Sequence, residues 1–332
     1  MKKPQKERLE RIVKQFVGKK VLIIGDVMLD EYVFGTTSRL SPEAPIPIVD
    51  VEKTVHVPGG AANAAFNLRS IGDETFLVGV VGKDEQAQQV KALLEEKGVK
   101  TDGLFVDPSR PTTLKSRIIS QNQHIVRIDR EKKHPLSKEM EKKLLRFVLP
   151  QIAKSDIVLI SDYDKGVVTS GLAQTVIATA KKKGKKVLVD PKGVDFSKYR
   201  GCFMVTPNLK ELEIALRMEK LDIKTLPQSA KMLLVHVNAD AVLVTLSKHG
   251  MALLEKNGRY IHLPAPDVRV VDISGAGDTA IATFALALAA GADFEEAMFI
   301  STFACAVVIG KPGTATCSRE ELYRSIRETA LE

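Results

Sequence analysis

A chain of 332 residues has room for one large α/β domain, and its hydrophobic fraction of 44% and charged fraction of 27% are ordinary for a globular protein. The lack of Trp and the aromatic fraction of 5% argue against a stacking platform for single-stranded nucleic acid, and the net charge of +8 comes from dispersed Lys and Arg. Three widely spaced cysteines, Cys202, Cys305 and Cys317, fit neither a metal cluster nor a disulfide framework, and the longest apolar stretch, residues 279–290, is too short for a membrane span. We therefore expect a cytoplasmic protein that binds neither nucleic acid nor a membrane.

Residues 2–20 have the apolar spacing of an amphipathic helix, and short continuous apolar runs then recur along the chain. These runs are rich in β-branched residues and are separated by helical patterns, which is typical of parallel strands buried on both faces. The helices include residues 84–97, ended by Gly98, and residues 170–183, ended by Gly184. The apolar runs are residues 21–24, 76–81, 157–160, 187–189, 203–205 and 241–244.

Polar or charged residues follow each apolar run, where the expected strand ends. Because the carboxyl ends of parallel strands meet at one edge of an open α/β sheet, and ligands bind at that edge, we expect these residues to surround a binding site. They are Asp26, Asp84, Asp162, Asp190, Asn208 and Thr245.

Two stretches, residues 32–58 and 112–129, interrupt this α/β pattern. The first contains several prolines and scattered Ile and Val residues without helical spacing. The second is typical of a hairpin, with strands near residues 113–119 and 124–128. We expect a small β-sheet that projects from the main domain, either as a lid over the strand ends or as a dimer face. Ordinary surface hairpins are the alternative.

Residues 272–279 have the sequence DISGAGDT and lead into the apolar run of residues 279–290. The glycines allow a tight backbone turn and the close approach of a ligand. The start of the following helix supplies unpaired N–H groups and the positive end of the helix dipole, which favour anionic oxygens. A carboxylate beside such a site, here Asp278, is what phosphoryl transfer to an alcohol requires. The alternative is a glycine-rich turn with an Asp cap before a core helix.

Two motifs, PGGAAN at residues 58–63 and DISGAGD at residues 272–278, resemble the signatures of the ribokinase-like (pfkB-type) carbohydrate kinases. The resemblance extends over roughly residues 21–321. It implies a three-layer α/β fold with a central, mainly parallel sheet, helices on both faces and a small β-sheet lid, in a single kinase domain over residues 1–332. It also implies that the cofactors are ATP and Mg²⁺. Further elements in the order typical of the family are residues 79–98, 208–211 and 245–250.

Within this family, further stretches are most similar to kinases that phosphorylate the anomeric hydroxyl of D-glycero-D-manno-heptose 7-phosphate. That likeness implies heptose 1,7-bisphosphate as the product, in the synthesis of ADP-heptose for lipopolysaccharide. The alternatives are a family member that acts on another sugar or a nucleoside, and a silent sugar- or nucleotide-binding regulator. The stretches are residues 25–30, 37–45, 161–166, 190–193 and 310–314.

The resemblance also implies partners. Bifunctional relatives continue into a nucleotidyltransferase domain, whereas this chain ends at Glu332 without one. We therefore expect a stand-alone kinase whose pathway partner is a separate nucleotidyltransferase. Exposed strand edges on the lid favour a homodimer.

By resemblance, Asp278 is the base that takes the proton from the sugar hydroxyl. The backbone N–H groups of Gly275, Ala276 and Gly277 form an anion hole for the transferring phosphate. Asp272 is the expected contact of a monovalent cation such as K⁺.

Glu211 is the residue expected near Mg²⁺, directly or through water. It lies three residues after Asn208, so the pair also fits a helix cap with its capping-box acid, and the two interpretations are compatible. The family often has Gly where this chain has Ser247. The expected nucleotide contacts are Asn208, Leu209, Lys210, Glu211, Ser247, Gly250, Ser274, Lys311 and Gly313.

Asp30 aligns with the family carboxylate that binds sugar hydroxyls. Gly59 and Gly60 let the backbone meet the sugar or form a structural turn, and Asp26 is a second sugar contact or a helix cap. The Lys and Arg residues of this set are candidates for binding the substrate's own phosphate. The expected substrate contacts are Asp26, Asp30, Gly59, Gly60, Asn63, Arg117, Lys165 and Lys192.

Overall fold

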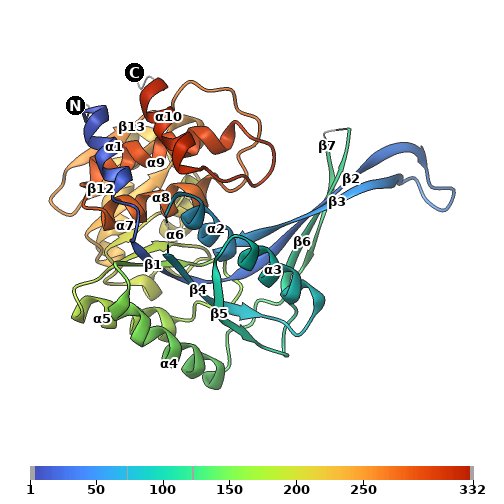
Figure 1. The fold of residues 1–332 in the computed structure, drawn as a ribbon, viewed down its shortest axis with the longest axis horizontal. Coiled ribbons are helices and arrows are strands. Elements are labelled where there is room, and N and C mark those ends of the chain that lie inside the picture. The colour runs from blue at the N-terminus through green and yellow to red at the C-terminus, as the bar shows by residue number, and fades with distance from the viewer. Residues whose placement is uncertain (1–3, 73, 122, 330–332) are drawn as a thin grey trace.

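The computed structural model describes residues 4–72, 74–121 and 123–329, and its body is built on a nine-stranded sheet with the order β13-β12-β11-β10-β9-β8-β1-β4-β5 (Figure 1). In that order, the strands from β11 to β5 are parallel, whereas β12 and β13 form an antiparallel extension. Each predicted apolar run contributes one of the parallel strands. The bounds are β1 (Lys20–Gly25), β4 (Glu74–Val81), β5 (Lys100–Val106), β8 (Ile157–Ser161), β9 (Lys186–Asp190), β10 (Met204–Val205), β11 (Ala241–Thr245), β12 (Met251–Glu255) and β13 (Tyr260–Leu263).

Side chains of the central strand β1 point alternately into two separate cores. Val21 and Ile23 belong to one core, and Leu22 and Ile24 belong to the other. This alternation follows from the two-residue period of a strand, and it explains why the run is apolar at every position. The body therefore has three layers, with helices on both faces of the sheet, as predicted.

The helices divide between the two faces according to the core in which their apolar residues lie. On one face lie α1 (Lys6–Lys14), α2 (Ala61–Ile71), α3 (Glu85–Glu96), α8 (Ala276–Ala289), α9 (Phe294–Ile309) and α10 (Arg319–Glu328). On the other face lie α4 (Lys138–Lys154), α5 (Ser170–Lys182), α6 (Leu209–Leu216) and α7 (Leu226–Val237). Within the described residues, none of the helices has the length and apolar character needed to cross a membrane.

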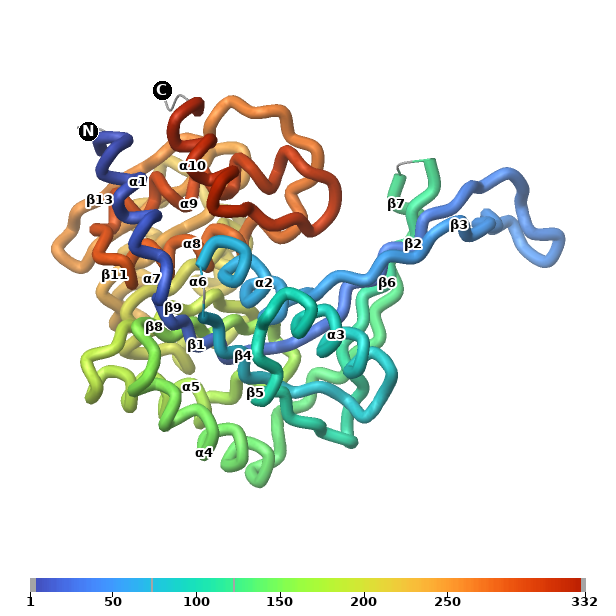
Figure 2. Tube along the Cα trace, viewed as in Figure 1, coloured from blue at the N-terminus to red at the C-terminus, as the bar shows by residue number. Residues whose placement is uncertain are grey.

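A second sheet of four strands, in the order β3-β2-β6-β7, projects from the body as the predicted β-sheet lid (Figure 2). Its strands β2 and β3 extend beyond the predicted residues 32–58, because β2 starts directly after β1 and β3 runs into the glycines before α2. The outer parts of the lid are exposed, including every residue of β7. The bounds are β2 (Val27–Leu40), β3 (Pro47–Gly60), β6 (Thr113–Ser120) and β7 (Gln123–Arg130).

The structure differs from the sequence-based expectations at the edges of the fold. Helix α1 is shorter than the predicted helix over residues 2–20, because the chain turns after it, with Gly18 at a φ of 77°. The described part of the predicted helix also begins later, at Lys6. The strands β5, β12 and β13 were not among the predicted runs. Polar residues or glycine interrupt the apolar character of β5 and β13, whereas β12 (MALLE) is an apolar run that the sequence-based prediction missed.

Candidate active site

Helix α8 begins at Ala276, three residues before the predicted apolar run, so Asp278 lies in its first turn. The preceding residue, Gly275, has a φ of 79°, a conformation that favours glycine. A Cβ at Gly275 would also lie 2.9 Å from Nδ2 of Asn63 and 2.9 Å from Cγ2 of Thr314. A Cβ at Gly277 would meet nothing within 4 Å, so this backbone borders open space. The first turn of α8 is therefore open to a ligand.

Asp278 is 5% exposed, and each of its carboxylate oxygens accepts a hydrogen bond. Tyr163 donates its hydroxyl to Oδ1 at 2.7 Å, and Asn63 donates its amide to Oδ2 at 2.6 Å. Asn67 in turn donates to the side chain of Asn63 at 3.2 Å. Burial raises the pKa of Asp278 to about 6, although the bonds from Tyr163 and Asn63 act in the opposite direction. A carboxylate with this pKa is ionised at neutral pH and can accept a proton.

A cavity of about 200 Å³ lies between this helix start and the carboxyl ends of β9, β10 and β11. The predicted edge of the sheet is thus the edge that carries the cavity. Of the predicted site residues it brings together Lys192, Asn208, Glu211, Gly275, Gly277 and Asp278. Other residues that line it are Tyr163, Asp190, Thr206 and Thr245.

Asn208 and Glu211 form the capping box that their spacing predicts. The Asn208 side chain accepts from the Glu211 N–H at 2.9 Å, and Oε2 of Glu211 accepts from the Asn208 N–H at 2.8 Å. The other oxygen, Oε1, lies 2.8 Å from Nζ of Lys192. Among the described residues, three or more His, Cys, Asp or Glu side chains do not come together as a metal site. Glu211 keeps free lone pairs, so it fits a Mg²⁺ ion that is held mainly by phosphates and water.

The ammonium of Lys192 balances several carboxylates around the cavity. Burial raises the pKa of Asp190 well above its usual value, and the charges of Glu211 and Asp278 raise it further. Burial alone would lower the pKa of Lys192, but Glu211 and Asp190 raise it. Lys192 therefore keeps its positive charge, paired with Glu211 and near the carboxylates of Asp190 and Asp278.

At the lid side of the site, Asp30 forms an ion pair of 2.6 Å with Arg117, whose guanidinium lies 5.2 Å from the centre of the Tyr32 ring. A Cβ at Gly59 would lie only 2.5 Å from Oδ2 of Asp30. The hydroxyl of Tyr32 is 2.9 Å from Oγ1 of Thr314, so the base of the lid touches the loop after α9. Gly59 is therefore needed for close packing against the carboxylate of Asp30.

Asp26 does not cap a helix, because Gly60, with a φ of 57°, precedes α2 at the cap position. The buried carboxylate of Asp26 accepts from the backbone N–H groups of Tyr163, Lys165 and Val167, at 2.7, 3.1 and 3.1 Å. A Cβ at Gly60 would lie 2.5 Å from the backbone oxygen of Asp26, which gives this glycine a structural role in the turn. Asp26 thus anchors the loop of residues 162–167.

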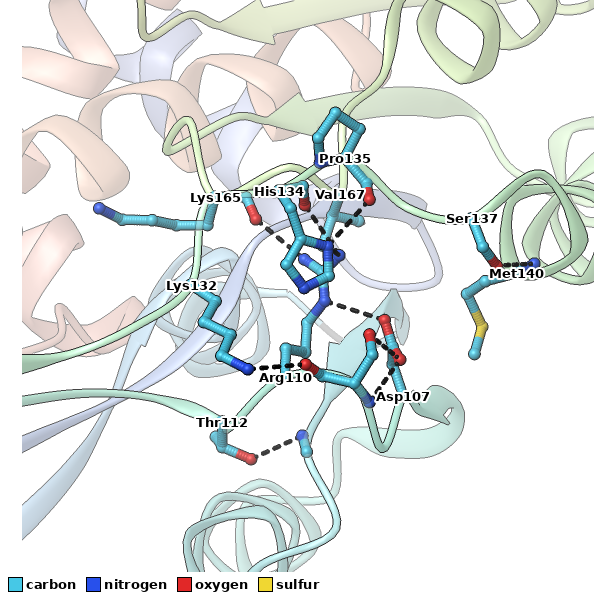
Figure 3. Close-up of polar contacts among 12 residues, drawn as sticks. Asp107, Arg110, Thr112, Lys132, His134, Pro135, Ser137, Met140, Lys165 and Val167 are labelled. Atoms are coloured by element: carbon cyan, nitrogen blue, oxygen red, sulfur yellow. Dashed lines mark hydrogen bonds and ion pairs between the residues drawn. The ribbon is translucent and has the colours of Figure 1, made fainter.

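Arg110 supports the same loop from the other side (Figure 3). Its guanidinium donates to Oδ2 of Asp107 at 2.9 Å, to the backbone oxygen of Lys165 at 3.0 Å and to that of His134 at 2.9 Å. In the figure the Lys165 side chain points away from this network, and its ammonium lies 2.7 Å from Oε2 of Glu131. The predicted substrate contact Lys165 is therefore paired with an acid at the lid.

The loops expected to contact the nucleotide are held by specific contacts. The carboxylate of Asp272 accepts from the Ser274 N–H at 2.8 Å and from the Gly313 N–H at 3.1 Å. The ammonium of Lys311 is bound by the Thr316 oxygen at 2.8 Å and by Glu321 at 2.6 Å. Asp272 and Lys311 thus fix the shape of the two loops.

Ser247 has a φ of 53°, the left-handed conformation that the family's glycine would adopt easily. Gly250, with a φ of 85°, completes the same turn after β11, and a Cβ there would lie 2.1 Å from the Leu263 oxygen. The turn is thus kept despite the replacement of glycine by Ser247.

Two further residues, which are not among the predicted site residues, lie at the cavity and on the lid. Tyr163 lines the cavity and follows β8 after Asp162, so its place at the carboxyl edge of the sheet could have indicated a role. Lys115 lies on β6 two residues before Arg117, and this spacing places both on one face of the strand. Lys115 is half-buried, and burial followed by the charge of Lys165 lowers its pKa. Among the described residues, none of the carboxylates lies within ion-pair distance of Lys115.

A three-layer α/β body, a β lid and a buried carboxylate at the start of an apolar helix together define a kinase that phosphorylates a sugar hydroxyl. The chain belongs to the pfkB family of carbohydrate kinases, whose family model matches residues 19–321.

The chain is similar to curated relatives that are named bifunctional protein HldE. It is 43% identical to the one from Bradyrhizobium diazoefficiens over 312 residues, which are 93% of this chain and 63% of the relative. It is also 43% identical to the one from Helicobacter pylori strain J99 over 311 residues, which are 94% of this chain and 67% of the relative. The chain thus spans about two thirds of the length of these relatives.

Solved structures with the same fold include ribokinase from Arabidopsis thaliana in complex with ribose and ATP, with a TM-score of 0.75 and 21% identity over 93% of this chain and 99% of that chain. Phosphofructokinase-2 from Escherichia coli in complex with potassium has a TM-score of 0.76 and 20% identity, over 93% of this chain and 98% of that chain. These likenesses show the ribokinase-like fold.

Proposed function

We propose that the protein transfers the terminal phosphoryl group of ATP to the anomeric hydroxyl of D-glycero-D-manno-heptose 7-phosphate and so forms heptose 1,7-bisphosphate. The observation that carries this proposal is Asp278, buried in the first turn of α8 and facing a polar cavity. The similarity to the HldE proteins supports the choice of a heptose. The product would serve ADP-heptose synthesis for lipopolysaccharide.

In this reaction, Asp278 accepts the proton as the anomeric O–H bond breaks. The sugar oxygen bonds to the terminal phosphorus of ATP while the bond to the bridging oxygen breaks and ADP leaves. The N–H groups of Gly275, Ala276 and Gly277 stabilise the charge on the transferring oxygens. The raised pKa of Asp278, about 6, keeps the base ionised at neutral pH but basic enough to take a proton.

Glu211 and Asn208 would hold Mg²⁺ near the nucleotide phosphates, through water in the case of Glu211. When bound, the ion would neutralise charge on the phosphates. Asp272 and neighbouring backbone oxygens of the loop of residues 311–316 are the proposed contacts of a monovalent cation such as K⁺. The contacts of Asp272 with Ser274 and Gly313 support this assignment, because they join the two loops around it.

We assign Lys192 to the transferring phosphoryl group, although the sequence made it a candidate contact of the substrate's own phosphate. Its ammonium lies 2.8 Å from Glu211 and lines the cavity with Asp278. A cation in this cavity is suited to stabilise the negative charge that moves from nucleotide to sugar. Lys192 thus belongs to the transfer end of the site.

The substrate's own phosphate would bind at the base of the lid, where the charge of Lys165 is near enough to Lys115 to lower its pKa. Arg117 and Lys165 are each paired with an acid, whereas Lys115 is half-buried on the face of β6 that carries Arg117. An unbalanced, partly desolvated ammonium is unfavourable until an anion joins it. We therefore assign Lys115, with Arg117 and Lys165, to the phosphate of a sugar phosphate.

The body and lid act as one kinase domain in this proposal, and two copies pair through the lid. The edge strand β7 exposes Ile125, Val126 and Ile128, which supports such pairing. Analytical ultracentrifugation of the whole chain, compared with a Val126→Lys variant, tests the homodimer. A monomeric wild-type protein would contradict it.

The test of the function is a panel of sugars and sugar phosphates with ATP and Mg²⁺. ADP release measures turnover, and phosphorus NMR locates the new phosphate. Heptose 7-phosphate should be the best substrate, with the new phosphate on the anomeric oxygen. Preference for a free sugar or a nucleoside would favour another reaction of the same family, and a failure to turn over any compound would favour a silent regulator.

A further inference from the structure

Tyr163 lies in the loop between β8 and α5 and lines the same cavity as Asp278. Its hydroxyl occupies one oxygen of that carboxylate at 2.7 Å, and Asn63 occupies the other at 2.6 Å. Each carboxylate oxygen has two lone pairs, so each keeps one for a further partner. The two donors therefore fix the directions from which Asp278 can accept a proton.

The backbone that carries Tyr163 is held by a buried charge. Asp26 is 1% exposed and accepts three N–H groups from this loop, including that of Tyr163 at 2.7 Å. The next residue, Asp164, has a left-handed φ of 57°, and its N–H is bound by Oδ1 of Asp162 at 2.7 Å. So many contacts on a short loop restrict where the tyrosine ring can lie.

The ring itself has a second contact, with Lys192. The ammonium of Lys192 lies 5.2 Å from the ring centre, and the same ammonium is paired with Glu211 at 2.8 Å. Tyr163 thus contacts both Asp278 and a cation that lines the same cavity. Its hydroxyl alone reaches Asp278, so that contact can be removed without removing the ring.

We propose that Tyr163 is a positioning residue for the catalytic base: its hydroxyl holds Asp278 so that a free lone pair faces the hydroxyl of the bound sugar. This inference rests on the function proposed above. The proton passes from the sugar oxygen to Asp278, and Tyr163 keeps its own proton throughout. Burial, followed by the charge of Asp278, raises the pKa of Tyr163 well above its usual value, so the phenol remains a donor.

The hydroxyl also influences the basicity of Asp278. Burial raises the pKa of Asp278 to about 6, and the hydrogen bond from Tyr163 is the first of the contacts that lower it. Removal of the hydroxyl leaves the carboxylate buried with one fewer donor. The pKa of Asp278 should then rise above about 6, because the charged form has lost a stabilising bond.

The test is the Tyr163→Phe variant, which keeps the ring and its contact with Lys192. With ATP and heptose 7-phosphate, kcat at neutral pH should fall roughly 10- to 100-fold, the usual effect of losing a hydrogen bond to a charged group. The acidic limb of the kcat–pH profile should move upward by on the order of one pH unit. The Kd of ATP, measured by calorimetry, should stay near the wild-type value.

Tyr199→Phe is the matched control, because Tyr199 also donates to a carboxylate at 2.7 Å, that of Asp162, outside the cavity. In Tyr199→Phe, the acidic limb of the kcat–pH profile should stay in place, even if the unfolding temperature changes. A wild-type kcat in Tyr163→Phe, or a loss of kcat without movement of the limb, would overturn the inference.

The Asp278→Asn variant is assayed in parallel. A nearly normal rate in Asp278→Asn would contradict the proposed role of Asp278 as the base. An inactive Asp278→Asn together with an unaffected Tyr163→Phe would contradict only the inference about Tyr163. Should Tyr163→Phe not fold, 3-fluorotyrosine incorporated at position 163 keeps the ring and makes its hydroxyl a stronger donor. The acidic limb should then move downward, and an unmoved limb would overturn the inference.

Discussion

At the body end of the candidate site, Asp278 is 5% exposed and already bound by two side-chain donors. At the lid end, Lys115 is half-buried and, among the described residues, lacks a carboxylate within ion-pair distance. The first group lies on a buried helix between the sheet and other helices. The second lies on a projecting sheet whose edge strand is exposed throughout.

This difference suits two different tasks. A group that takes part in bond making must be held in place before the reaction, since reorganisation during the reaction adds to the barrier. A group that recognises an anion is better left without a partner, because an internal acid would compete with the ligand. We infer that the body end is organised for chemistry and the lid end for recognition, and that stability is sacrificed at the lid.

The largest expected effect is at the body end. Asp278→Asn should lower kcat roughly 10²- to 10⁴-fold, since the amide cannot take the sugar proton. The Kd of ATP and of the sugar phosphate should change little, because the side chain keeps its shape. Steady-state assays and calorimetry measure these quantities. Asp240→Asn, at an exposed carboxylate near the opposite end of β11, is the control. Turnover near the wild-type rate in Asp278→Asn would contradict the assignment of the chemistry to Asp278 at the body end.

The next largest effect tests whether the lid end recognises the phosphate of the sugar phosphate. Lys115→Met should raise KM for the sugar phosphate roughly 10- to 100-fold, with kcat almost unchanged, because a contact with a charged ligand is lost. The same variant should unfold at an equal or higher temperature without ligand, because an unbalanced, partly buried charge has been removed.

The exposed Lys53 on lid strand β3 provides the matched control. Lys53→Met removes a lysine from the same sheet and should change neither KM nor the unfolding temperature. If Lys115→Met and Lys53→Met behave alike, the lid end does not recognise the phosphate through Lys115.

A smaller, pH-dependent effect should come from the base alone. Asp278 acts when it is deprotonated, and burial raises its pKa to about 6. The value of kcat should therefore be constant above that pH and fall about tenfold per unit below it. A phosphate monoester also titrates near pH 6, so kcat/KM mixes the two groups, whereas kcat at saturating substrate isolates the bound enzyme. A kcat that is flat down to pH 5 would contradict the assignment.

The parts that the sequence could predict are those that depend on neighbours along the chain. The buried runs of residues 21–24 in β1 and 157–160 in β8 are apolar at every position, because both faces of these strands are covered. The Asn208–Glu211 capping box follows from a spacing of three residues. The position of Asp278 in the first turn of α8 follows from the glycines before it. Such local patterns were sufficient for the body of the fold and for the placement of Asp278 at the start of α8.

The remaining parts depend on pairings between distant segments. Tyr163 and Asp278 are 115 residues apart, and only the parallel sheet brings them together. Lys115 has no ion-pair contact among the described residues, whereas Arg117 is paired with Asp30 and Lys165 with Glu131, and these pairings follow from strand register and loop packing. Asp26, expected at the sugar or at a helix cap, is instead taken up by three loop amides. These pairings join residues that are far apart in the chain, so patterns among neighbouring residues do not predict them.

The smallest expected effect concerns Ser247, on the body side of the site. Its φ of 53° is unfavourable for serine, with a penalty of about 1–2 kcal/mol, whereas glycine in a fixed position loses about 0.5–1 kcal/mol more chain entropy. Ser247→Gly should therefore raise the free energy of unfolding by up to about 1 kcal/mol, measured by urea denaturation. Ser247→Ala retains the Cβ in the left-handed region and should bring no gain. Equal effects of the two substitutions would show that backbone strain at this turn does not limit the stability of the body.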